Sequence, residues 1–195
     1  MPSKKREHLI ATALDLFSQY GYRATGIDTI LAESGVAKMT LYNHFKSKDE
    51  LIIAALKKRD DDFMQWLGDA MIRHSAQQQG DPRTHKLLAL FDSLHEWINS
   101  EAFYGCNFIN ASIEFKSEDS PVHKAASAHK KLKLNVLQEL LSELKLDNGD
   151  DNISDIAKQI HMIIEGAIVM AVTIDEKNAA LMGKKTALKI LQDHL

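Results

Sequence analysis

The sequence has few residues that would interrupt a helix or cross-link the chain. Among 195 residues it contains one cysteine, Cys106, and three prolines, at positions 2, 82 and 121. A single cysteine forms no internal disulfide, which fits a reducing compartment and leaves stability to the hydrophobic core. Proline removes a backbone donor and clashes with the preceding helical turn, so the proline-free stretches 3–81 and 122–195 favour long helices. We therefore predict an all-α protein.

Long hydrophobic runs are absent as well. The longest uncharged apolar run, residues 166–174, lies between Glu165 and Asp175 and is less than half of the roughly 20 residues that a membrane-spanning helix needs. The basic amino end resembles a signal peptide, but Glu7 and Asp15 interrupt its apolar stretch and no small-residue cleavage site follows. We expect a cytoplasmic protein that has no membrane partner.

The two ends of the chain differ in charge, although the net charge is only −3. Residues 1–59 contain ten lysines and arginines against six acidic residues, whereas residues 60–195 contain fourteen against twenty-one. A basic segment on an acidic body suits a protein that binds a polyanion through one end, because each cation at a phosphate releases condensed counterions. The alternative is chance patchiness, since this excess of positive charge is modest.

Hydrophobic periodicity predicts nine helices and no internal repeat. Capping residues mark three of the helix starts: Thr25 with Asp28, Ser47 with Glu50, and Ser120 before Pro121. Polar residues with glycine and proline make residues 74–82 the clearest loop, and residues 147–152 end the seventh helix. The predicted helices cover residues 7–20, 26–34, 38–45, 47–73, 83–99, 103–115, 122–145, 153–174 and 178–194.

Residues 1–47 have the pattern of a helix-turn-helix domain, in which the recognition helix covers about residues 38–45. Gly35 suits the left-handed conformation that the turn needs, and Leu41 with Phe45 would anchor the recognition helix inward. The opposite face of that helix is then free to enter a DNA major groove. This arrangement favours DNA as the polyanion.

The segment RATGIDTILAESGVAKMTLYNHFKSKDEL resembles the DNA-binding signature of TetR-type transcriptional regulators, and the resemblance covers roughly residues 5–55. It implies base contacts from Met39, Thr40 and Asn43. It also implies contacts to the DNA backbone from Thr25, Lys38, Thr40, Tyr42, His44 and Lys48. By residue type alone, Tyr42 and His44 also fit packing positions, and the lysines also fit a solvated surface. The implied DNA-binding residues are Thr25, Lys38, Met39, Thr40, Tyr42, Asn43, His44 and Lys48.

Three residues depart from the pattern of that family. Leu31 and Met39 replace usually small residues, and Ala37 replaces the usual serine or threonine cap of the recognition helix. Loss of an N-cap costs roughly 1 kcal/mol, so we expect this helix to order fully only on DNA. For Met39 we hypothesise a contact with a thymine methyl group.

The resemblance further implies that residues 48–195 form an effector-binding and dimerisation domain. Two copies of the chain, each with a three-helix head and a larger helical body, would then form a homodimer. The predicted helix 153–174 is apolar nearly all round in its second half, and such a helix must be covered on more than one side. The alternative is a core helix within one protomer. We expect the dimer interface on this helix and on the last predicted helix, as the resemblance also implies. The residues assigned to it are Ile163, Gly166, Ala167, Met170 and Ala171.

Asn107, Asn110 and Glu114 form a narrow polar stripe along the otherwise apolar helix predicted over residues 103–115. It either faces a cavity, where a few polar groups orient a partly apolar ligand, or faces solvent. His161 and Glu165 also fit a local pair, and Cys106 also fits core packing. The candidate effector-binding residues are Trp66, Phe91, Trp97, Cys106, Asn107, Asn110, Glu114, His161 and Glu165.

The sequence shows no pattern of a catalytic, cofactor or metal site. No two of the nine histidines stand three or four residues apart, and Cys106 has no cysteine partner. Phosphate-binding glycine loops and nucleophile elbows are also missing.

We predict a non-enzymatic regulator without cofactor. It would be a repressor that a small, partly apolar effector releases from a palindromic double-stranded DNA operator. The alternative is a helical carrier of a hydrophobic ligand without a DNA function.

Overall fold

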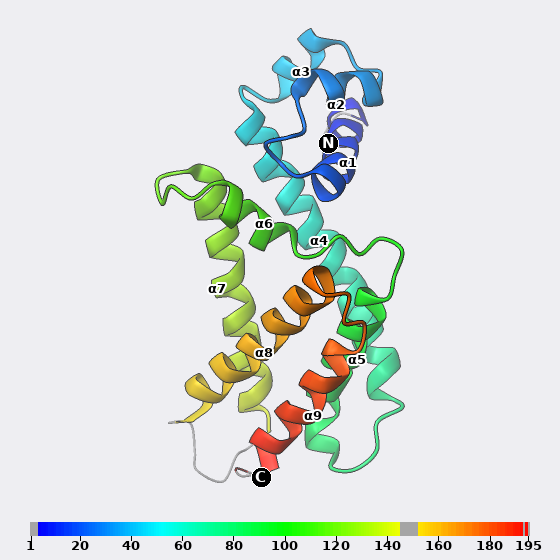
Figure 1. Ribbon diagram of the computed structural model, residues 1–195, viewed down its shortest axis with the longest axis vertical. Helices are drawn as coiled ribbons and strands as arrows, with labels where there is room; N and C mark the ends of the chain where they lie inside the picture. The colour runs from blue at the N-terminus through cyan, green and yellow to red at the C-terminus, as the bar shows by residue number, and fades with distance from the viewer. Residues whose placement is uncertain (1–3, 145–151, 193, 195) are drawn as a thin grey trace. The chain divides into compact units, whose positions relative to one another are not determined.

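The computed structural model describes residues 4–144, 152–192 and 194 (Figure 1). Within these residues the chain forms nine α-helices and one 3-10 helix and has no strand, which confirms the predicted all-α class. The elements are α1 (Lys4–Tyr20), α2 (Ile27–Ser34), α3 (Lys38–His44), α4 (Lys48–Ser75), η1 (Pro82–Thr84), α5 (His85–Ile98), α6 (Asn107–Glu114), α7 (Pro121–Ser142), α8 (Ile153–Thr173) and α9 (Ala179–Gln192).

Several local signals act as predicted. The Ser47 hydroxyl accepts from the N–H of Glu50 at 3.2 Å, and the Glu50 carboxylate reaches back to the N–H of Lys46 at 2.8 Å. Helix α7 begins at Pro121, and the Ser120 hydroxyl accepts from the N–H of His123. These caps satisfy backbone donors that no helical carbonyl reaches.

The predicted Thr25 cap of α2 and the predicted start of α6 are wrong. The N-cap of α2 is Gly26 and makes no side-chain cap, because the Thr25 hydroxyl instead donates to the carbonyl of Gly21 at 2.8 Å. Helix α6 begins at Asn107, four residues later than predicted, because Gly105 has φ +83°, which helices exclude. The predicted end of the seventh helix near Lys145 and the break over residues 147–151 lie outside the described residues.

The chain divides into two compact units, one formed by residues up to 63 with 106–130, the other by residues 64–105 with 131–195. Helices α4 and α7 each run through both units, so these units do not follow the predicted functional division at residue 47. That division, which assigns DNA binding to residues 1–47 and effector binding to residues 48–195, stays a prediction.

The first unit contains α1, α2 and α3 beside the first turns of α4 (Figure 1). Its core joins these helices to residues much later in the sequence, because Phe108 and Ala111 of α6 and Val122 and Ala126 of α7 are buried in the same cluster. The helix-turn-helix therefore shares its hydrophobic core with α6.

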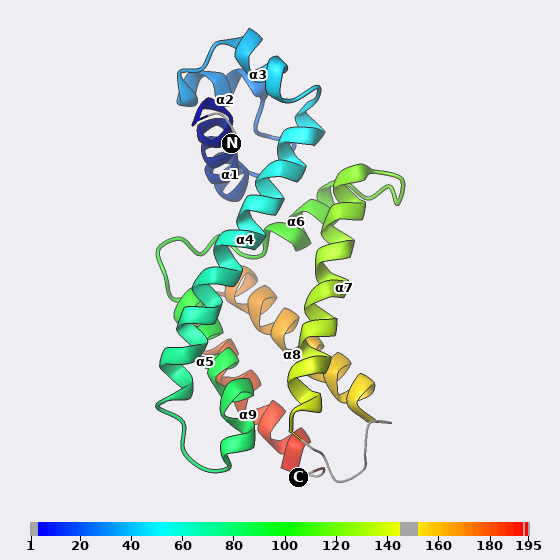
Figure 2. The ribbon, with the colours of Figure 1, turned by 180° about the vertical axis from the view of Figure 1, so that it is seen from behind.

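In the second unit, α9 packs against both α5 and α8 (Figure 2). Gly183 permits a close approach, since a Cβ at this position would meet Ile163 at 2.8 Å and the Phe91 ring at 3.1 Å. Glycine is therefore required where α9 crosses its neighbours. The buried core residues of this unit come from α5, α7, α8 and α9 and include Leu87, Phe91, Leu141, Ile156, Ile160, Ala187 and Leu191.

Candidate nucleic-acid interface and effector site

The turn before α3 positions the candidate recognition helix. Gly35 adopts the left-handed conformation, with φ +64°, and its N–H donates to the carbonyl of Leu31. Leu41 and Phe45 are buried on the inner side of α3, and the Arg6 guanidinium lies over the Phe45 ring at 5.1 Å. Packing on one side thus fixes α3 and leaves its other side outward.

The outward side of α3 carries most of the residues that the family resemblance implies for DNA binding. Met39 is 78% exposed and Tyr42 is 47% exposed. Lys38 and Asn43 are exposed as well, and Lys38 pairs with Asp28 at 3.4 Å. Thr40 and His44 are half-buried at the margin of this surface. The side chains on this face offer donors, acceptors and one long apolar group.

Thr25 is placed differently from the others. Only 2% of this residue is exposed, and its hydroxyl donates to the carbonyls of Gly21 and Leu16 at 2.8 and 3.3 Å. The structure therefore corrects the implied role of Thr25: its hydroxyl closes the loop between α1 and α2 and faces away from the surface.

Lys48 stands at the start of α4, and its ammonium group donates to the carbonyl of Arg23 at 3.4 Å. Burial lowers the pKa of Lys48 from its ordinary value, while Glu114 and Asp49 act in the opposite direction. The loop between α1 and α2 thus holds the lysine next to the amino end of α4.

Helix α6 uses two of the predicted effector residues to hold this loop. The Asn107 side chain donates to the Ser18 hydroxyl of α1 at 2.8 Å, and the Asn107 backbone carbonyl accepts from the Tyr22 hydroxyl at 3.0 Å. The Glu114 carboxylate accepts from the N–H groups of Tyr22 and Arg23 at 2.9 and 2.7 Å. Burial raises the pKa of the Tyr22 hydroxyl strongly, so this group stays a donor. Both polar side chains are occupied within the first unit.

The nine candidate effector-binding residues fall into both units. Cys106, Asn107, Asn110 and Glu114 belong to the first unit; Cys106 and Asn110 are half-buried. The other five belong to the second unit, where Trp66 is half-buried, Phe91 is fully buried and Trp97 packs edge-on against Phe103 at 4.9 Å. His161 and Glu165 stand 3.8 Å apart as a local pair on α8.

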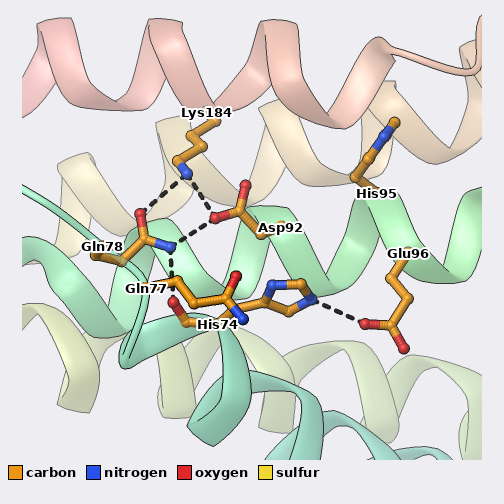
Figure 3. Close-up of a pocket in the computed structure, with 7 residues that line it drawn as sticks. All are labelled: His74, Gln77, Gln78, Asp92, His95, Glu96 and Lys184. Carbon is orange, nitrogen blue, oxygen red and sulfur yellow. Dashed lines mark hydrogen bonds and ion pairs between the residues drawn. The ribbon is translucent and has the colours of Figure 1, made fainter.

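A polar pocket of about 400 Å³ lies in the second unit between the end of α4, the start of the following loop, α5 and α9. Figure 3 shows Lys184 paired with Asp92 and with the Gln78 amide oxygen, while His74 pairs with Glu96 at 2.8 Å. Burial raises the pKa of Glu96, but hydrogen bonds from His74 and Arg73 outweigh it and lower that pKa. The lining residues are His74, Gln77, Gln78, Asp92, His95, Glu96 and Lys184.

This pocket could not be predicted from the sequence, because its residues come from separate elements and have no common spacing. Only the i,i+4 pair of Asp92 and Glu96 on the helix predicted over residues 83–99 could have pointed to it. Among the described residues, no group of three or more histidine, cysteine, aspartate or glutamate side chains could hold a metal ion.

The predicted dimer residues lie on two different sides of α8. Ala167 and Ala171 are only 4% and 3% exposed within one protomer, so the structure corrects their assignment to a partner contact. Ile163 is half-buried beside Gly183, whereas Gly166 and Met170 are exposed. The prediction missed four other exposed apolar residues, namely Met162, Val169 and Val172 on α8 and Met182 on α9.

Helix α8 is also long and apolar enough to span a membrane, by length and composition alone, and one third of that segment (33%) is buried. No long uncharged run marks this helix in the sequence, because Lys158 and Glu165 interrupt it. An exposed apolar surface of this kind is typical of a site that contacts another protein or a membrane.

Two family models match the chain. Residues 9–55 match the model of bacterial regulatory proteins of the tetR family, and residues 84–186 match the model of the tetracyclin repressor-like C-terminal domain.

Individual relatives match over most of their length. The chain is 27% identical over 169 residues to the HTH-type transcriptional regulator LmrA of Bacillus subtilis (strain 168), and the matched segment covers 86% of each protein. It is 23% identical over 164 residues to the HTH-type transcriptional regulator YjdC of Escherichia coli (strain K12), covering 84% of this chain and 81% of YjdC. The crystal structure of SCO4454, a TetR-family transcriptional regulator from Streptomyces coelicolor, matches with a TM-score of 0.83 and 29% identity, covering 99% of this chain and 91% of that one.

Proposed function

This chain belongs to the TetR family of bacterial regulatory proteins, and on that basis we propose that it is a repressor that a small effector releases from a palindromic operator. Members of the family are DNA-binding transcriptional regulators and not enzymes. The observation that carries the proposal is the outward face of α3, where Met39 and Tyr42 are exposed while Leu41 and Phe45 anchor the helix from behind.

In this proposal α3 enters the major groove of the operator. Met39, Thr40 and Asn43 read base edges: Met39 and Asn43 are exposed on the outward face, and Thr40 lies at its margin. Phosphates are bound by the polar and cationic residues around them, which position the helix without reading sequence. These phosphate-binding residues are Lys38, Thr40, Tyr42, His44 and Lys48.

A palindromic operator requires two heads, and the exposed side of α8 supports a homodimer. Met162, Gly166, Val169 and Met170 recur at helical spacing along this side and are exposed. Burying such a stripe against the same stripe of a second copy removes apolar surface from water. The pairing would allow two recognition helices to occupy half-sites about 34–36 Å apart. It also accounts for the apolar character of α8 in a protein that we place in the cytoplasm, beside the DNA.

Release of the operator requires an effector that prefers the DNA-incompetent form of the dimer. Equal affinity for both forms would shift nothing, however tightly the effector bound. We propose a small, partly apolar effector and retain the aromatic residues Trp66 and Trp97, together with Asn110, His161 and Glu165, as candidate contacts. Helix α4 is the proposed lever, because it is one continuous helix from Lys48 to Ser75.

The proposal is tested by selecting binding sites from a pool of random double-stranded DNA with the purified full-length protein. We expect an enriched palindrome with half-sites one helical turn apart. Placed over a promoter, that palindrome should lower reporter expression when the protein is produced; higher expression would make the protein an activator. A pool without an enriched sequence would favour the alternative, a helical carrier of a hydrophobic ligand.

A further inference from the structure

We infer that Glu114, a residue of α6 far outside the DNA-binding segment of the sequence, is a positioning residue for DNA binding. This inference rests on the proposed function, because it requires that Lys48 binds the operator backbone.

The Glu114 carboxylate holds the loop between α1 and α2 through both of its oxygens. One oxygen accepts from the N–H of Tyr22 at 2.9 Å, and the other accepts from the N–H of Arg23 at 2.7 Å. These bonds are charge-assisted and bidentate, which gives them both strength and a fixed direction. A single side chain therefore determines the course of two consecutive residues of the loop.

The fit of the carboxylate is close. Gly21, which precedes the two bonded N–H groups, has φ +86°, and a Cβ there would stand 3.0 Å from the Glu114 Oε1 atom. The Arg23 guanidinium lies over the ring of Phe115, the residue after Glu114, at 5.6 Å. Backbone and side-chain contacts thus both fasten the loop to the end of α6.

The same loop determines where Lys48 is held. The backbone carbonyl of Arg23 accepts from the Lys48 ammonium group at 3.4 Å. Arg23 therefore binds Glu114 through its N–H and Lys48 through its carbonyl. The loop continues directly into α2, the first helix of the helix-turn-helix. Glu114 is thereby connected to a proposed phosphate contact through one peptide segment, without touching DNA itself.

The sign of the expected effect separates positioning from simple electrostatics. Glu114 is negatively charged, so its removal would by charge alone strengthen binding to a polyanion. If Glu114 positions the loop, its removal weakens binding instead. A matched control is Glu118→Ala, which removes the same charge from an exposed residue four positions away.

The experiment measures the dissociation constant of full-length Glu114→Ala, Glu114→Gln and Glu118→Ala for the selected operator over a series of salt concentrations. We expect Glu114→Ala to bind about tenfold more weakly and its salt slope to fall by about 1, because one phosphate contact is misplaced. Glu114→Gln should be intermediate, since it keeps one oxygen acceptor. Glu118→Ala should bind as tightly as the unchanged protein or more tightly.

Unfolding curves of each variant, recorded beside the titrations, identify any general loss of structure. If Glu114→Ala does not fold, the salt slope of Glu114→Gln decides. Unchanged affinity, or weaker binding with an unchanged salt slope, would overturn the inference while leaving the proposed function in place. If the unchanged protein itself showed no preference for any operator, the proposed function would fail and the inference with it.

Discussion

Met39 is the residue whose placement bears most directly on base recognition. It is the most exposed large apolar residue of the described chain, at 78%, on a helix whose opposite side is buried. An exposed methionine gains nothing from the core, so its apolar surface is available for a thymine methyl group. The sequence singled out this position as an unusual residue, and the structure supplies the exposure.

Replacement of Met39 by alanine should relax the preference at one base pair of each half-site. We expect a discrimination loss of about 1 kcal/mol, because a single apolar contact to a base is removed. Selection from random DNA with the Met39→Ala protein measures this directly. An unchanged consensus at every position would refute the contact.

The pairing of Glu96 predicts a dependence of stability on pH. Hydrogen bonds from His74 and Arg73 lower the pKa of Glu96 below its unfolded value, which is about 4.3 for glutamate. A depressed carboxyl pKa stabilises the folded protein above the unfolded pKa, and this contribution is lost as pH falls through the folded pKa. Glu96→Gln should thus lower the free energy of unfolding at pH 7 by about 1 kcal/mol or less, as for other partly exposed pairs.

Urea unfolding of Glu96→Gln at fixed protein concentration, compared between pH 7 and pH 3, tests this expectation. The difference from the unchanged protein should shrink below about pH 4. Glu101→Gln, on the exposed segment after α5, serves as the control. An equal difference at both pH values would show that Glu96 acts by packing and not by charge.

At the level of elements, the weakest feature of the candidate interface is the start of α3. Ala37 occupies the N-cap with extended backbone, φ −63° and ψ 142°, and supplies no side-chain acceptor. The first backbone donors of α3 therefore have no side-chain cap, as the sequence predicted from the missing serine or threonine. A poorly capped recognition helix is one that DNA binding would stabilise further.

Ala37→Ser should supply the missing cap. A serine in this conformation accepts from the N–H two or three residues later and stabilises the helix by about 1 kcal/mol. We expect slower hydrogen exchange of the α3 amides in the free protein. Ala32→Ser, in the exposed middle of α2, is the control and should not slow exchange in α3. Exchange in α3 that stays as fast as before would count against an uncapped start.

Helices with clear periodicity could be predicted from the sequence, whereas the features that depend on tertiary contacts could not. The helix ends at Ser47, Pro121 and Gly35 depend on contacts with residues nearby in the sequence. Their roles could therefore be predicted from neighbouring residues. The start of α6 and the role of Thr25 were missed, because a helical pattern does not reveal the positive φ of Gly105 or a hydroxyl that turns inward. The polar stripe of α6 was found, but its attachment to α1 and to the following loop, 89 and 92 residues earlier, was not.

For the whole molecule, the central expectation is a symmetric dimer through α8. The sequence identified the helix from its apolar second half but not its orientation, since Ala167 and Ala171 face the protomer's own core and Met162 and Val169 face outward. Orientation depends on which side α9 covers, and periodicity alone does not determine this.

Met170→Glu should disrupt the proposed dimer, because a carboxylate buried against an apolar surface without a partner is strongly unfavourable. We expect the dimer dissociation constant to rise by at least about 30-fold, which corresponds to about 2 kcal/mol. Sedimentation equilibrium over a concentration series measures it. Gln65→Glu adds the same charge to an exposed position of α4 and should leave association unchanged. Equal association of both variants would place the interface elsewhere.

The measurement that tests the account most directly is a salt series of binding to the selected operator and to random DNA. The unchanged protein is compared with the double variant Tyr42→Ala, Lys48→Ala. We predict saturable operator binding that weakens steeply with salt and exceeds binding to random DNA, together with a large loss of affinity and a shallower salt slope in the double variant. Operator binding no tighter than binding to random DNA, or a double variant that binds as tightly as the unchanged protein, would contradict DNA recognition through α3 and the start of α4.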